Sequence, residues 1–175
     1  MKWISGTKED ILNELNKEKQ VQQTTDQKVE EATKQIIERV IQAGDQVLRD
    51  YSKQFDGADL THLEIDRAVI EEACQKTAPN IRQALERAKE NIISYHEKQK
   101  QHDFMDAEKN GVFRGQLVRP LARVGVYVPG GTAAYPSSVL MNVLPAKIAG
   151  VKEIVMVTPP SEAGVPAVIL AAAKI

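Results

Sequence analysis

The feature that most constrains the fold is a sharp drop in charge density near residue 110. Residues 1–110 hold 17 basic and 22 acidic side chains, whereas residues 111–175 hold only six basic and two acidic ones. Glycine and proline become more frequent in the second part, and valine and isoleucine begin to cluster there. The first part therefore favours solvated amphipathic helices, and the second favours a buried α/β layer. We place a domain boundary between residues 110 and 111.

The overall composition excludes several classes of protein. The chain of 175 residues has a formal net charge of −1, with 42% hydrophobic and 27% charged residues. This composition is globular, and the near-neutral charge gives no electrostatic reason to expect nucleic acid or a membrane surface as a partner. A single cysteine, Cys74, is typical of a reducing compartment, and the first ten residues lack the apolar stretch of a secretory signal. We expect a soluble cytoplasmic protein without a membrane span.

Apolar residues at helical spacing dominate the first part. The pattern predicts four helices, at residues 26–42, 46–55, 67–76 and 78–100. The last of these carries a narrow apolar seam suited to packing along another helix, formed by Ile81, Leu85, Ala88, Ile92 and Tyr95. This part reads as a helical packing region.

The second part alternates between β-rich runs and helical runs. The pattern predicts an edge strand or hairpin arm at 112–118, buried strands at 124–128 and 154–157, and helices at 136–149 and 165–175. Strands that alternate with helices in this way are typical of a parallel sheet with right-handed crossovers. Ligands bind such sheets beyond the carboxyl ends of the strands. The candidate binding edge is therefore formed by Tyr127–Thr132 and Thr158–Glu162.

The expected sheet is incomplete. Two parallel strands with their helices cannot cover both faces and both edges of a sheet. The last expected helix also reaches Ile175 without a Gly, Asn or Pro terminator. We therefore expect an α/β fold that further polypeptide completes. A small domain that is swapped or completed by a partner remains an alternative.

The loop Tyr127–Ser138, with the sequence YVPGGTAAYPSS, is the strongest local signal. Gly130 and Gly131 let the backbone approach a ligand closely, and the amides that precede a helix suit an anion such as a nucleotide pyrophosphate. The loop departs from G-x-G-x-x-G, however, and a tight turn without a ligand fits it as well. His96 and His102 are six residues apart, which is not the spacing of a helical metal pair. The residues themselves indicate no catalytic group and no metal site.

The segment Arg123–Pro160 closely resembles the characteristic segment of the histidinol dehydrogenases. Upstream, Ala43–Gly57 resembles that family's second-helix segment, and Val118–Pro120 matches the stretch that leads into the strand. The similarity covers essentially the whole chain. The resemblance implies a Rossmann-like core related to the aldehyde dehydrogenase fold, and residues 111–175 would be the first part of its NAD-binding domain.

The resemblance also implies an activity. The family converts L-histidinol through histidinal to L-histidine, the last steps of histidine biosynthesis, and uses two NAD molecules in turn as a zinc-dependent homodimer. Tyr127 stands where the family's tyrosine contacts NAD, and Pro129, Gly130 and Gly131 line the same loop. The family's zinc ligands and its acid/base pair belong to segments farther along the polypeptide. We therefore expect the amino-terminal portion of such an enzyme, with no catalytic or metal-binding residue and no turnover by itself.

Two alternatives stay open at this point. In the first, the chain is a non-catalytic helical assembly module that pairs with itself, or with a separate carboxyl-terminal half, through the seam from Ile81 to Tyr95. In the second, it belongs to another nucleotide-binding enzyme of the aldehyde dehydrogenase-like fold. The second is disfavoured because no nucleophilic cysteine follows the glycine loop.

Overall fold

The computed structural model describes residues 3–108, 110–130 and 133–175. It divides the chain into two compact units, Met1–Asp50 and Tyr51–Ile175. The first unit is mostly helix, and the second combines helices with two small sheets. This is the α/β organisation expected from the sequence, with a helical segment ahead of a short parallel sheet. Within the described ranges, no helix is long and apolar enough to cross a membrane.

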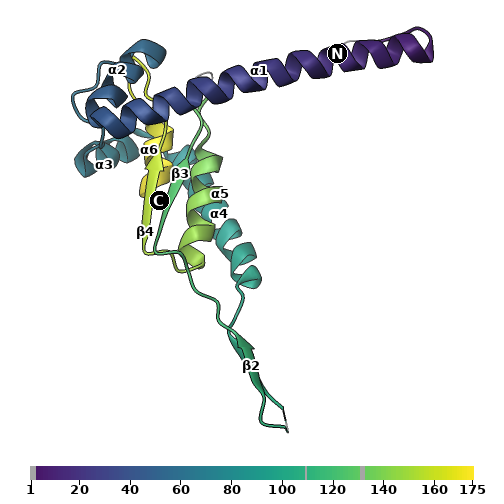
Figure 1. The fold of residues 1–175 in the computed structure, drawn as a ribbon. Coiled ribbons are helices and arrows are strands. Elements are labelled where there is room, and N and C mark those ends of the chain that lie inside the picture. Colours follow the sequence, from purple (N-terminus) through teal and green to yellow (C-terminus); the bar gives the residue numbers. More distant parts are fainter. Residues whose placement is uncertain (1–2, 109, 131–132) are drawn as a thin grey trace. The chain divides into compact units, whose positions relative to one another are not determined.

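The first unit is dominated by helix α1, which spans Lys8–Ala43 (Figure 1). A capping box starts it: the Asp10 N–H donates to Thr7 Oγ1 at 3.3 Å, and the Thr7 N–H donates to Asp10 Oδ2 at 3.0 Å. The helix therefore begins at Lys8, and the expected start at residue 26 is wrong. The pattern missed residues 8–25 because they carry mostly charged and amide side chains and show little apolar periodicity. Gly44 ends the helix with a φ of +59°, where a side chain would be strained.

The helices of the second unit lie close to their expected positions. Helix α2, Asp45–Asp56, leads into this unit, and α3 spans Arg67–Lys76. Helix α4 spans Pro79–His96 and continues as a 3₁₀ turn, η1, over Glu97–Gln99. The expected helix at 78–100 is thus confirmed in its position, with a tighter last turn.

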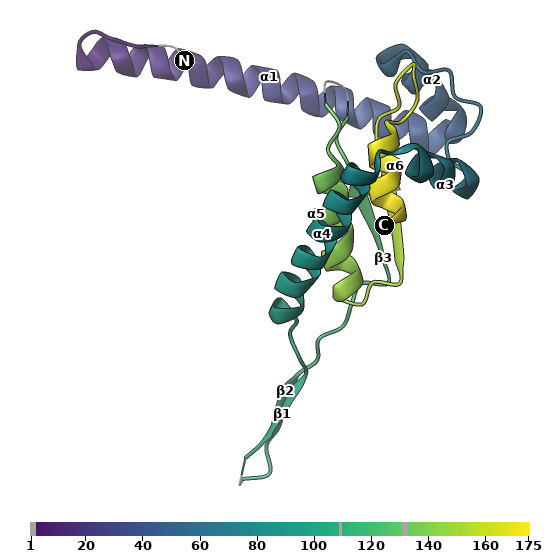
Figure 2. The same cartoon turned by 180° about the vertical axis from the view of Figure 1, so that it is seen from behind.

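A β-hairpin follows η1 and projects from the rest of the second unit (Figure 2). Strand β1, Phe104–Ala107, pairs antiparallel with β2, Phe113–Gln116, and every residue of both strands is exposed. Only the second arm was expected from the sequence. The expected domain boundary at residues 110 and 111 falls in the loop of this hairpin. The division into a helical packing region and a cofactor-binding region stays a prediction.

The parallel sheet consists of β3, Arg123–Tyr127, and β4, Glu153–Val157. The strands are in register, so that Arg123 lies opposite Glu153 and Tyr127 lies opposite Val157. Helix α5, Pro136–Ile148, connects them, and α6, Ala167–Lys174, follows β4. The order β3–α5–β4–α6 confirms the alternation expected from the sequence.

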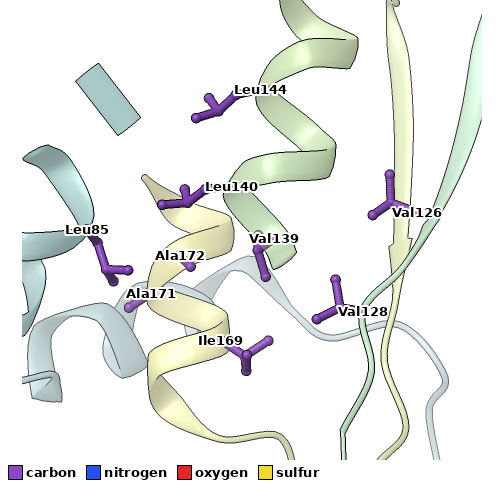
Figure 3. Close-up of a cluster of buried hydrophobic side chains, with 9 residues drawn as sticks. All are labelled: Leu85, Val126, Val128, Val139, Leu140, Leu144, Ile169, Ala171 and Ala172. Atoms are coloured by element: carbon purple, nitrogen blue, oxygen red, sulfur yellow. The ribbon is translucent and has the colours of Figure 1, made fainter. Parts of the chain in front are cut away.

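One face of this sheet forms the core of the second unit. Figure 3 shows buried side chains that gather from α4, β3, α5 and α6, namely Leu85, Val126, Val128, Val139, Leu140, Leu144, Ile169, Ala171 and Ala172. Alternation along the strands places Tyr127, Val155 and Val157 on the opposite face, where all three are exposed. Parallel sheets ordinarily bury both faces, so the sheet is incomplete in the expected sense.

The base of the hairpin is closed by Asp103. Its Oδ1 accepts a hydrogen bond from the Val118 N–H at 2.6 Å, and its Oδ2 accepts one from Arg119 at 3.0 Å. The Val118 hydrogen bond, followed by the Arg119 one, holds the pKa of the Asp103 carboxyl below its usual value of 3.8. Because the folded pKa is lowered, this clamp stabilises the hairpin above the unfolded pKa and is lost as pH falls through the folded pKa.

We therefore expect the hairpin base to open only under strongly acid conditions. In an NMR titration, the Val118 amide resonance should move with a midpoint below 3.8, the usual pKa of the carboxyl. In Asp103→Asn the same resonance should not titrate over that range, because the amide side chain has no proton to gain. A midpoint at or above the usual value in the unsubstituted protein would contradict the clamp.

Candidate cofactor site

The candidate site lies at the carboxyl ends of the two parallel strands. The pairing continues one residue past β3, since the Val128 N–H donates to the Val157 oxygen at 2.8 Å. The Val128 side chain is fully buried in the core and so anchors the start of the loop. Tyr127, the residue before it, points to the opposite face and is 63% exposed. The strand therefore fixes the Tyr127 backbone and leaves its ring open to a ligand.

The loops after β3 and β4 lie against each other. A Cβ built on Gly130 would lie 3.4 Å from Pro159 Cδ and 3.6 Å from Thr158 Oγ1. These are ordinary contact distances, so the protein has room for an alanine at this position. The two segments expected to form the binding edge are thus brought together. Neither the fold nor a positive φ requires the glycine.

The structure describes Tyr127, Pro129 and Gly130 of the four residues predicted to bind a cofactor. Pro129 and Gly130 are exposed at the mouth of the loop, as is Tyr127 beside them. Gly131, the fourth predicted residue, lies outside the described residues. The role of all four at a cofactor stays a prediction.

The loop ends at the start of helix α5. Its N-cap residue, Tyr135, makes no side-chain capping hydrogen bond and is 40% exposed. Helix N-termini present free N–H groups and a partial positive charge, which favour an anion such as phosphate. Tyr135 is not among the residues predicted from the sequence; the one local signal for it is its position directly before a proline that begins a helix.

His96 and Cys74 belong to helices α4 and α3, which precede β3 in the sequence. His96 ends α4, where its ring meets that of Tyr95 edge-on, with 5.2 Å between the ring centroids. Cys74 is half-buried against the core. Among the residues that the structure describes, no group of three or more His, Cys, Asp or Glu side chains is placed to hold a metal ion.

This arrangement defines an α/β protein with two parallel strands, at whose carboxyl ends the candidate site lies. A family model described as histidinol dehydrogenase matches residues 19–175. Histidinol dehydrogenases from Listeria monocytogenes and Listeria innocua are 56% and 58% identical over 175 residues, the whole of this chain. The one from Streptococcus mutans is 53% identical over 172 residues, or 98% of the chain. The chain therefore belongs to the histidinol dehydrogenase family, a family of oxidoreductases.

The chain spans 40% of the length of each of these relatives. A crystal structure of histidinol dehydrogenase from Elizabethkingia anophelis superposes with a TM-score of 0.79 and 33% sequence identity. That match covers 83% of this chain and 34% of the crystallised one. The expected correspondence to the amino-terminal portion of the family's polypeptide is confirmed.

Proposed function

We propose that this chain supplies part of the NAD site of a histidinol dehydrogenase. In the proposed reaction, the whole enzyme oxidises L-histidinol through histidinal to L-histidine, as the last steps of histidine biosynthesis. The proposal includes a homodimer, zinc and a cytoplasmic location, all of which rest on family membership. The observation that supports the cofactor role is the closeness of Gly130 to Thr158 and Pro159, within reach of a single methyl group, which brings two loops together at the edge where α/β sheets bind ligands.

The residues of the loop fit a dinucleotide. The exposed Tyr127 ring offers a flat apolar face to a base or a ring of the cofactor. The start of α5 offers the positive end of the helix dipole to a pyrophosphate, and no side chain caps it. Bound NAD would accept a hydride from the substrate. The contribution of this chain is to bind and orient the cofactor.

The proposal assigns zinc to no residue of this chain. The described residues hold no cluster that fits a metal ion, and the resemblance places the zinc ligands and the acid/base pair elsewhere in the family's polypeptide. The proposed role of this chain is therefore to bind the cofactor, with the catalytic side chains supplied elsewhere in the enzyme.

The test is a substitution of Tyr127 in a full-length enzyme that carries this sequence. In Tyr127→Ala, the Kd for NAD measured by calorimetry should rise by about tenfold, because the loss of ring contacts is worth roughly 1.4 kcal/mol. The thermal midpoint of the NAD-free enzyme is measured beside the Kd, so that a loss of stability is distinguished from a loss of ring contacts with NAD.

Tyr95→Ala is the matched control, because Tyr95 is 62% exposed and lies on α4. It should leave NAD affinity unchanged. Gly130→Ala tests the loop itself: the fold has room for the methyl group, so weaker NAD binding without loss of stability would place the cofactor against the glycine. Equal NAD affinity in Tyr127→Ala and the unsubstituted enzyme would contradict the proposal.

The assembly-module alternative has no observation in its favour. Leu85 of the seam is buried in the core, and Ala88 and Ile92 pack against that core. The middle of the seam is therefore used inside the chain, and only its ends, Ile81 and Tyr95, are exposed.

A further inference from the structure

The β1–β2 hairpin has two chemically different faces. Residues paired across an antiparallel ladder lie on the same face. One face is mixed: it carries Phe104 opposite Gln116 and Asp106 opposite Arg114, whose Nη2 lies 3.0 Å from Asp106 Oδ2. The other face carries Met105 opposite Gly115 and Ala107 opposite Phe113. We call these last four residues the apolar hairpin face.

The apolar hairpin face is among the most exposed apolar surfaces of the chain. Met105 is 77% exposed and Phe113 is 72% exposed. A Cβ built on Gly115 would lie 2.6 Å from Met105 Sδ, so the methionine side chain lies across the glycine. The face therefore presents apolar atoms with no side chain of its own to cover them. Because two-stranded hairpins are marginally stable in water, a cover on this face would stabilise the pairing.

The size of this face decides between two occupants. Side chains of this kind and exposure offer on the order of 300–400 Å², whereas a stable interface between separate proteins buries about 800 Å² per partner. A second copy that docked through this face alone would fall well short. A segment joined to the hairpin through the same polypeptide needs far less area, because binding within one chain loses little translational and rotational freedom.

The relatives provide such a segment. Each of the Listeria and Streptococcus enzymes has more than half of its length outside the match to this chain. We propose that, in full-length members of this family, the apolar hairpin face docks a segment of the same polypeptide from the part outside the match. This inference rests on family membership and is independent of the proposed NAD site.

The first experiment compares two phenylalanines of the hairpin in a full-length enzyme that carries this sequence. Phe113→Ser alters the apolar hairpin face, and Phe104→Ser is the matched control, because Phe104 is 56% exposed and lies on the opposite face. Hydrogen exchange of residues 104–116 should accelerate by about tenfold or more in Phe113→Ser and stay unchanged in Phe104→Ser. The subunit number from light scattering should be the same in both variants.

Three outcomes of this experiment would overturn the proposal. Equal exchange in the two variants would mean that the apolar hairpin face is not covered. A change of subunit number in Phe113→Ser alone would make a second copy the occupant. Free exchange of the hairpin in the unsubstituted enzyme would mean that nothing docks there.

A second measurement needs no variant and so does not depend on folding of the substituted protein. Met105 oxidation by hydrogen peroxide is followed by mass spectrometry in the unsubstituted full-length enzyme, native and unfolded in urea. A covered Met105 should oxidise at least about tenfold more slowly in the native enzyme. Equal rates would overturn the proposal. Neither experiment measures NAD binding or turnover, so their failure would leave the proposed function untouched.

Discussion

The 175-residue chain, supplied with NAD, Zn²⁺ and L-histidinol, should form NADH no faster than a protein-free solution. Enzymes of ordinary efficiency accelerate reactions by about a millionfold or more, so the expected difference from a full-length family member is of that order. The physical reason is that proton removal and metal binding need side chains that the resemblance places elsewhere in the family's polypeptide. The described residues hold no metal-binding cluster that would replace them.

The measurement is the appearance of NADH by absorbance, with the full-length Listeria monocytogenes relative as the positive control. Adding the remaining part of that relative as a separate polypeptide separates two reasons for inactivity. Recovered turnover would mean that the chain folds and contributes its part of the site. NADH formation by the chain alone, at a rate near that of the relative, would refute the proposed division of labour.

The second large effect concerns the core between the sheet and its helices. Leu140 on α5 is 2% exposed and belongs to the cluster that joins α4, β3, α5 and α6. Leu140→Ala should lower the free energy of unfolding by about 3 kcal/mol, because it removes buried apolar atoms and leaves a cavity that neighbouring helices fill only in part. Denaturation in urea, followed by circular dichroism, measures this loss.

Met141→Ala is the matched control for this substitution. Met141 is the next residue on the same helix and is 50% exposed, so its truncation should cost less than about 1 kcal/mol. Both substitutions shorten a large apolar side chain in the middle of α5, so helix propensity changes little between them. Equal losses would show that Leu140 does not pack in a common core.

Much of the second unit could be predicted because its local signals agree with its packing. The runs at 124–128 and 154–157 are rich in β-branched residues, and Pro136 marks the start of α5. The first half of α1 was missed because its sequence carries charge rather than an apolar stripe. Strand β1 was missed because its residues are all exposed and do not alternate between buried and solvated positions.

The candidate site, too, could be predicted in its local features and not in its tertiary arrangement. The run from Tyr127 to Ser138 indicated a ligand loop, because glycines and a following helix start are local features of the chain. The closeness of Gly130 to Thr158 and Pro159 brings together segments about thirty residues apart in sequence, and only the parallel register of β3 and β4 creates it. The room for a methyl group at Gly130 likewise depends on how far Thr158 and Pro159 lie from it.

The sequence by itself determined the family, the order of helices and strands in the second unit, and the position of the glycine loop. These depend on side-chain periodicity and on local backbone preference, which neighbouring residues specify. Only the tertiary structure shows that the middle of the α4 seam packs in the core. It alone also shows that Tyr127 faces outward while Val128 is buried. It also decided that the hairpin carries an uncovered apolar face. These properties depend on which surfaces meet, and distant segments of the chain must pack before any of them exists.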